Sequence, residues 1–286
     1  MGAYETIEVL ALSGALGAEI RGIDVSCPLS PQAAQEIHQA WLAHQVIFFR
    51  GQTLTPEQHI AFAKQWGDVH HHPFNKPLDG YPEILDILKT EDMTHNNGGR
   101  WHSDQMYTVK PAKATILYAR EMPQIGGDTL FANAYLAYES LSKGLRASLE
   151  GLHAVNNGDS RRHPSGLTRA ERAAAGIGTM LQKDPGNTQT ISVHPVVRTH
   201  PETGRKALYI GGHTERFDGM SEEESRPLLD YLLKLAARPE FTCRLRWEVG
   251  TLTMWDNRCT QHFAINDYDG ARRRVHKITV AGEAPY

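Results

Sequence analysis

The chain has 286 residues, enough for one large domain or two small ones. Its net charge of −3, with Lys and Arg spread along the sequence, argues against nucleic-acid binding, and no apolar run approaches the ~20 residues that span a bilayer. Three cysteines without a C-x-x-C pair argue against a disulfide scaffold and, with no signal peptide, predict a reducing, cytoplasmic location.

The first part of the chain alternates between helical and strand patterns. The segments "SPQAAQEIHQAWLAHQ" (30–45) and "TPEQHIAFAKQW" (55–66) both open with a hydroxyl residue and a proline, which suit the cap and first position of a helix. Short apolar runs predict buried strands at 46–50, 84–88 and 114–120.

The second part of the chain is richer in predicted strands. Residues 133–152 have a helical period, and residues 221–240 open with a capping box and predict another helix. Residues 156–190 are rich in Gly, Asn, Arg and Ser, and we interpret them as a long excursion that serves as a lid or insert. Apolar runs predict closing strands at 241–248, 251–256 and 276–282.

The order of these elements decides between fold classes. There is no regular alternation of strands and helices and no Gly-rich phosphate loop after a strand, which disfavours a doubly wound or TIM-barrel fold. We therefore predict one mixed, mainly β domain over residues 1–286, built around a β-sandwich or barrel.

The stretch "GRWHSDQMY" contains a candidate pair of metal ligands. If His102 and Asp104 lie on an extended segment, their side chains point to the same face, because the strand period is two. One imidazole and one carboxylate are too few to hold an active metal, and the candidate third ligand is His262 in "MWDNRCTQHFAINDY". Two histidines and one carboxylate form the facial triad of non-haem Fe(II) oxygenases.

Such oxygenases need a two-electron donor, and the sequence offers a site for one. 2-Oxoglutarate would bury its distal carboxylate, which requires a paired cation, and Arg offers a bidentate fork. Arg273 follows His262 by eleven residues, and Thr129 in "GGDT" is the candidate hydroxyl partner. Strand alternation places Arg272 and Arg274 on the opposite face.

Five motifs in order carry a family resemblance: "WHSD", "GGDTLF", "HPVVRTHPETGRKALYIG", "MWDNRCTQH" and "RRR". Together the motifs resemble the Fe(II)/2-oxoglutarate-dependent dioxygenases of the taurine dioxygenase / 2,4-D dioxygenase (TauD/TfdA) family. The similarity runs from about residue 7 to about residue 281.

The resemblance implies a double-stranded β-helix, or jelly roll, with flanking α-helices. It implies Fe(II) held by His102, Asp104 and His262, with 2-oxoglutarate held by Thr129 and Arg273 and O2 as second co-substrate. The implied reaction converts 2-oxoglutarate to succinate and CO2 and hydroxylates a substrate C–H, often with collapse to a carbonyl and a leaving group. The family also implies a homo-oligomer, a dimer or a tetramer.

The resemblance implies an anionic organic substrate: a sulfonate, an alkyl sulfate ester or an aryloxyalkanoate. His72 falls where taurine dioxygenases place a histidine near the sulfonate, and His213 is a further candidate. Asn75 replaces an expected tyrosine, Gly98 an expected asparagine and Lys277 an expected arginine, so taurine itself is disfavoured.

For several other histidines and one tryptophan we expect simpler structural roles. We expect His194, His200 and His276 to be packing residues and Trp255 to be a core aromatic beside the site. Two other functions remain open: a non-catalytic metal-binding jelly roll that acts as a sensor, and a zinc hydrolase. Neither of these alternatives needs the keto-acid site formed by Thr129 and Arg273.

Overall fold

The computed structural model describes residues 4–72, 74–159, 166–175 and 189–286. Its largest sheet has seven strands, antiparallel except between β2 and β3. In sheet order these are β1 (Glu8–Ala11), β2 (Ala18–Arg21), β3 (Val46–Phe49), β13 (Leu252–Asp256), β5 (Ala114–Glu121), β15 (Arg273–Val280) and β4 (Leu85–Lys89).

Two three-stranded sheets and one β-ribbon complete the β structure. The first small sheet consists of β12 (Thr242–Leu245), β6 (Thr129–Asn133) and β14 (Thr260–Ala264). The second consists of β11 (Thr214–Phe217), β7 (His153–Asn157) and β8 (Ile191–Pro195), and the ribbon pairs β10 (Lys206–Leu208) with β9 (Val197–Thr199).

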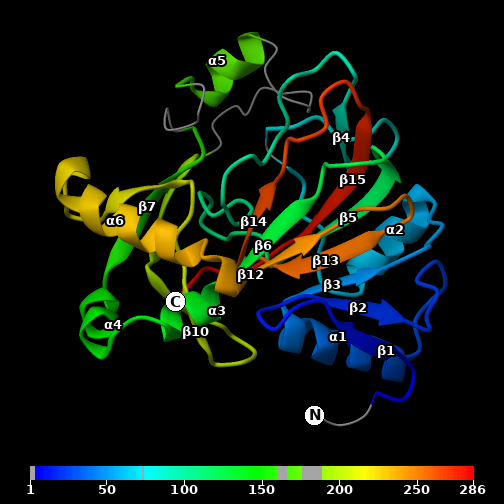
Figure 1. Ribbon diagram of the computed structural model, residues 1–286, viewed down its shortest axis with the longest axis horizontal. Helices are drawn as coiled ribbons and strands as arrows, with labels where there is room; N and C mark the ends of the chain where they lie inside the picture. The colour runs from blue at the N-terminus through cyan, green and yellow to red at the C-terminus, as the bar shows by residue number, and fades with distance from the viewer. Residues whose placement is uncertain (1–3, 73, 160–165, 176–188) are drawn as a thin grey trace.

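The large sheet is covered on both faces because its strands alternate. Ile47 and Ile116 pack with helix residues of α1 (Pro31–His44) and α2 (Pro56–Lys64), which lie on one side of the sheet (Figure 1). Val46 and Leu117, one position away, pack instead against Phe131 of β6. The result is a β-sandwich with flanking helices, as the jelly-roll expectation requires.

Three further helices gather at the other end of the molecule (Figure 1). They are α3 (Ala134–Glu139), α4 (Lys143–Leu149) and α6 (Glu222–Ala236), the last followed by the short 3-10 helix η1 (Pro239–Phe241). Their apolar faces form a second core with β7 and β11. No helix of the described residues is long and apolar enough to cross a bilayer.

One predicted helix was wrong in its extent. Residues 133–152 form two helices rather than one, because the chain leaves the helical conformation after α3 and restarts at α4. Asn133 caps α3, and the Ser142 hydroxyl accepts the backbone N–H of Leu145 to begin α4. The helical period of the apolar residues hid this break, since both short helices bury apolar residues in the second core.

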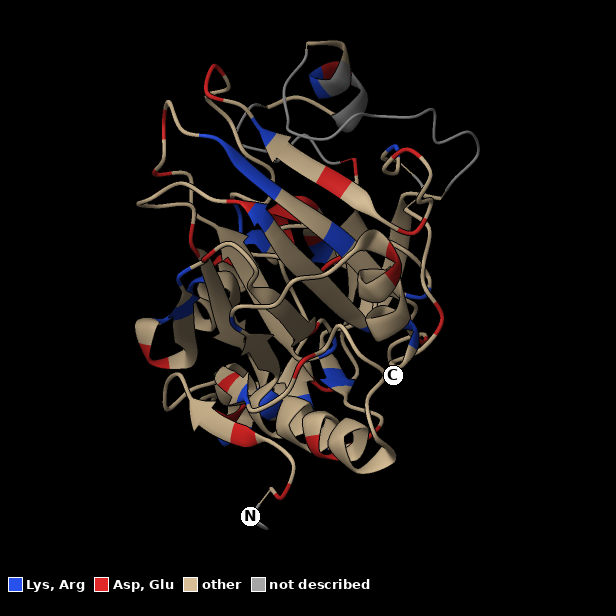
Figure 2. Cartoon of the chain, turned by 90° about the vertical axis from the view of Figure 1, so that its right-hand side faces the viewer, with Lys and Arg blue, Asp and Glu red and all other residues tan. Residues whose placement is uncertain are grey.

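The predicted lid at 156–190 lies partly outside the described residues. Within it, β7 continues to Asn157 and α5 spans Arg169–Ala174, while 160–165 and 176–188 are not described. The lid and the extent of the domain therefore stay predictions. In the view of Figure 2, acidic and basic segments are interspersed rather than separated by sign, in keeping with the small net charge.

Candidate functional site

The two candidate histidine ligands are joined through their backbones. His102 and His262 form an isolated antiparallel bridge, with N–H···O distances of 3.1 and 2.8 Å. His262 lies on β14, whereas His102 and Asp104 lie in the loop between β4 and β5. The H-x-D pair therefore lies in a loop and not on a strand. Only His102 is bridged, and the turn that begins at Asp104 directs its carboxylate toward both rings.

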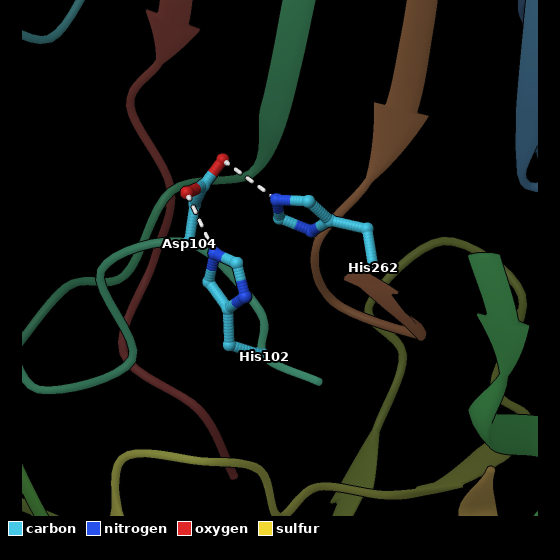
Figure 3. A group of neighbouring side chains, drawn as sticks. All are labelled: His102, Asp104 and His262. Carbon is cyan, nitrogen blue, oxygen red and sulfur yellow. Dashed lines mark ion pairs between the residues drawn. The ribbon is translucent and has the colours of Figure 1, made fainter. Parts of the chain in front are cut away.

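All three side chains converge on one point (Figure 3). His102 Nε2 lies 3.9 Å from Asp104 Oδ1, and His262 Nε2 lies 4.0 Å from Asp104 Oδ2. The His102 Nδ1–H donates to the Arg100 carbonyl at 2.7 Å, which leaves Nε2 with its lone pair facing the carboxylate. This is the tautomer that a metal ligand needs.

The protonation states of these side chains also suit a metal. Burial would raise the pKa of Asp104, but the charges of Lys277, His262 and His102 outweigh burial and lower it. Burial lowers the pKa of His102 and, further, that of His262. At neutral pH the carboxylate is ionised and both imidazoles are neutral, so each offers a lone pair to a cation.

The candidate keto-acid site lies in the same cavity. Arg273 is buried, its Nε donates to the Gly127 carbonyl at 3.1 Å, and its guanidinium lies 5.7 Å from the Trp247 ring. Trp247 Nε1 in turn donates to the Thr129 hydroxyl at 2.9 Å. Gly127 has a φ of +72°, and a Cβ there would lie 3.1 Å from Arg273 Cδ, so glycine leaves room for the arginine.

Arg273 differs from both neighbouring arginines in its charge partners. Arg274 pairs with Asp86 at 2.8 Å and Arg272 with Glu121 at 2.8 Å, both on the outer face. Arg273 makes no ion pair with any carboxylate that the structure describes, although burial disfavours its charge and lowers its pKa. A bound carboxylate would supply the missing partner, so the residues present fit 2-oxoglutarate.

The cavity has a volume of about 410 Å³ and unites the predicted residues. Its walls include the three candidate ligands, Thr129, Arg273 and all four candidate substrate residues: His72, Asn75, His213 and Lys277. Trp255 is buried and lines the cavity, with its ring centroid 4.7 Å from that of His262. Gly98, with φ of +88°, lies against the His102 ring, where a Cβ would be 3.5 Å from Cε1.

The four candidate substrate residues differ in their contacts. Lys277 Nζ lies 2.7 Å from Asp104 Oδ1, so the lysine points at the candidate ligand. His72 Nδ1 accepts the backbone N–H of Asn75 at 3.2 Å, and the Asn75 amide lies 3.3 Å from His72 Nε2. His213 Nδ1 lies 2.9 Å from an Arg100 guanidinium nitrogen.

Arg100 is a cavity residue that the sequence analysis missed. Its position two residues before His102 was the available signal, since the loop that carries the ligands must also line the site. Its pairing with His213, 113 residues away in sequence, could be seen only in the folded chain.

A second cluster of possible ligands, His200, Asp256 and Cys259, is structural. His200 Nδ1 accepts the backbone N–H of Glu202, so the proton is on Nε2, which donates to Asp256 Oδ2 at 2.9 Å. A protonated nitrogen cannot bind a cation, and the same carboxylate is held by Arg258 at 2.7 Å. His194 and His276 are likewise buried, and the former bonds a backbone carbonyl.

Comparison with known proteins finds a matching family and similar relatives. The family model described as "Taurine catabolism dioxygenase TauD, TfdA family" matches residues 8–279. An alkylsulfatase of Acinetobacter baylyi is 36% identical over 281 residues, covering 98% of this chain and 86% of its own. A sulfate ester dioxygenase of Pseudomonas putida, dependent on alpha-ketoglutarate (2-oxoglutarate), is 36% identical over 284 residues, covering 98% and 91%.

Comparison with solved structures also finds a similar dioxygenase. The crystal structure of a taurine dioxygenase from Burkholderia xenovorans superposes with a TM-score of 0.81 at 36% identity. The superposition covers 98% of this chain and 91% of the other. The mainly β fold expected from the sequence is thereby confirmed.

Proposed function

Because the chain belongs to the TauD/TfdA family and is a 2-oxoglutarate-dependent dioxygenase, we propose that it oxidises a small alkyl sulfate ester. The observation that carries the metal site and the anionic substrate is the His102–Asp104–His262 cluster in a cavity of basic side chains. The choice of a sulfate ester rests on the two similar relatives that are named for this substrate class. Among the described residues, Asp104 is the only carboxylate in that lining. A cavity so charged favours an anionic substrate.

His102, Asp104 and His262 would hold Fe(II), because two imidazoles and one carboxylate form the facial triad of non-haem Fe(II) oxygenases. When bound, the iron with 2-oxoglutarate and O2 supplies a two-electron oxidation that converts a C–H to a C–OH. The chain contributes geometry: the backbone bridge fixes the two rings, and the Arg100 carbonyl fixes the tautomer of His102.

Arg273 and Thr129 would hold the distal carboxylate of 2-oxoglutarate. The buried guanidinium supplies charge and the hydroxyl a further hydrogen bond. Neither a non-catalytic metal sensor nor a zinc hydrolase has a use for this pair, so both alternatives leave Arg273 as an uncompensated buried charge.

Lys277, His72 and His213 would orient the sulfate group, with Asn75 holding the His72 ring. One atom of O2 enters the substrate as R–CH(OH)–OSO3⁻ and the other enters succinate, with loss of CO2. Collapse of the hydroxylated ester breaks the C–O bond to sulfate, giving an aldehyde and hydrogen sulfate. The homo-oligomer that the resemblance implies stays a prediction.

The keto-acid site is tested by spectroscopy without turnover. Anaerobic addition of Fe(II) and 2-oxoglutarate should produce a visible charge-transfer band. Arg273→Ala should weaken 2-oxoglutarate binding ~10–100-fold, the usual cost of a hydrogen-bonded charge. Arg274→Ala, which removes the partner of Asp86 on the outer face, is the matched control and should leave the band intact.

The substrate class is tested by a panel of n-alkyl sulfates, alkanesulfonates, taurine and aryloxyalkanoates. Succinate release should be largest with an alkyl sulfate and should match aldehyde and sulfate release one to one. Equal or greater coupled turnover of a sulfonate or an aryloxyalkanoate would reject the sulfate-ester assignment while keeping the dioxygenase. Absence of the charge-transfer band in folded protein would count against the iron and keto-acid sites themselves.

A further inference from the structure

The Asp104 carboxylate oxygen nearest to His262 also accepts a hydrogen bond from a buried strand residue. The Thr115 hydroxyl donates to Asp104 Oδ2 at 2.6 Å. Thr115 lies on β5, its side chain is fully buried, and it is paired with Trp255 of β13. A strand residue therefore orients a carboxylate that itself belongs to a loop.

Asn257 completes this arrangement. Its Oδ1 accepts the backbone N–H of Asp104 at 3.2 Å and Trp255 Nε1–H at 3.0 Å. Both partners can only donate, so the oxygen of the amide is assigned and its nitrogen must face Thr115. Asn257 Nδ2 donates to Thr115 Oγ1 at 2.9 Å.

The donor and acceptor in each of these hydrogen bonds can be assigned in the same way. Thr115 Oγ1 already accepts a hydrogen bond from Asn257 Nδ2, so its own O–H donates to Asp104 Oδ2. The asparagine thus fixes the direction of the Thr115 O–H group. The hydroxyl in turn fixes the Asp104 carboxylate, which otherwise rotates easily about its last side-chain bond. Both members are completely buried, so water does not compete for these bonds.

We propose that Asn257 and Thr115 are positioning residues that set the orientation of the Asp104 carboxylate for metal binding. This inference rests on the metal site of the proposed function. With Oδ2 engaged by Thr115, the carboxylate cannot rotate freely between the two imidazoles. Loss of such a supporting bond lowers metal affinity ~10–100-fold in comparable sites.

The chain offers a matched control for a role in packing alone. Thr253 on β13 is also fully buried, and its hydroxyl has no hydrogen-bond partner among the described residues. It pairs with Leu117 on β5, two positions along the strand from Thr115. Thr253→Val and Thr115→Val therefore make the same change of shape in the same sheet, but only the second touches Asp104.

The experiment measures Co(II) affinity and the visible spectrum of the Co(II) protein. Thr115→Val should bind Co(II) ~10–100-fold more weakly and change the band pattern. Thr115→Ser, which restores the hydroxyl, should recover affinity to within a few-fold, and Thr253→Val should match the wild type. Wild-type affinity in Thr115→Val, or an equal loss in Thr253→Val, would overturn the proposal.

Asn257 is tested in two backgrounds. Because it acts on the carboxylate partly through the Thr115 hydroxyl, Asn257→Ala should weaken Co(II) binding more in the wild-type background than in Thr115→Val. Equal losses in both backgrounds would show that the two residues act independently, and would overturn the proposal that Asn257 acts through Thr115. Unfolding midpoints of all variants identify any protein that fails to fold.

The same measurements distinguish a failure of this proposal from a failure of the proposed metal site. Asp104→Ala gives the affinity of a protein without the carboxylate ligand. If the wild type and Thr253→Val bind no better than Asp104→Ala, the metal site itself is wrong. If both bind tightly and so does Thr115→Val, only the positioning role fails.

Discussion

Lys277 illustrates how a single side chain links the metal and substrate parts of the site. Its ammonium group lies 2.7 Å from Asp104 Oδ1, and it is also in the wall of the cavity. A metal cation bound to Asp104 would repel the Lys277 ammonium group, which would then be available to an anionic substrate. Arg273 and Lys277 are four positions apart on β15, so strand alternation places them on the same face, and both line the cavity.

Lys277→Met should raise KM for the anionic substrate by ~10–100-fold, because one hydrogen-bonded charge is lost. KM for 2-oxoglutarate should change much less, since Arg273 holds that carboxylate. Steady-state succinate assays with each substrate varied in turn measure both constants. Lys113→Met is the control, because Lys113 bonds the Trp66 carbonyl outside the cavity. An unchanged KM for the anion would remove Lys277 from the substrate site.

At the scale of elements, Glu36 shows how a helix fastens the start of the chain. This residue of α1 accepts the backbone N–H groups of Glu5 and Thr6 at 3.0 and 2.9 Å, and the Thr6 hydroxyl at 2.7 Å. Desolvation alone would raise the pKa of Glu36, but these hydrogen bonds lower it to about 2. The strand β1 begins two residues after Thr6, so the carboxylate holds the edge of the large sheet.

Glu36→Gln should destabilise the protein at neutral pH, and this loss of stability should become smaller at acidic pH. A pKa lowered in the folded state contributes stability above the ordinary value of 4.5, and that stability is lost as pH falls toward about 2. The stability difference from the wild type should therefore be full at pH 7 and shrink between about pH 4.5 and 2. Urea unfolding at several pH values measures it, and a difference that stayed constant with pH would contradict this account. Glu8→Gln, at an exposed position on β1, is the control.

The elements also show where sequence patterns suffice. Proline and a hydroxyl cap predicted the starts of α1 and α2, because capping depends on the first few residues alone. The division between α3 and α4 was missed, because the helical period continues through it. Short strands such as β9 and β10 were also missed, because three residues are too few to show an apolar alternation.

For the whole molecule, the candidate site joins parts that are far apart in the chain. His102 and Asp104 come from a loop, His262 from a small sheet, and Arg273 from the large sheet. A bound metal and keto acid would therefore link both layers of the sandwich. Ligands that bind only the folded state stabilise it by about 2.7 kcal/mol at a hundredfold excess over Kd.

Co(II) with N-oxalylglycine, an unreactive analogue of 2-oxoglutarate, should accordingly raise Tm by about 5 °C at such an excess. Asp104→Ala should abolish most of the shift due to the metal, and Arg273→Ala most of the additional shift due to the analogue. Differential scanning calorimetry measures these shifts. A shift of full size in Asp104→Ala would place the metal elsewhere.

The reaction class, the mainly β fold and the candidate ligands could be predicted from the sequence alone, because the motifs that carry them are local and occur in a fixed order. The sequence also predicted the inner face of β15, since strand alternation depends only on position in the chain. Three features became visible only in the folded chain: the loop that directs Asp104 toward both rings, the Arg100–His213 contact, and the Asn257–Thr115 support of the carboxylate. These contacts join residues from separate elements, and only folding brings their hydrogen-bonding groups within reach of one another.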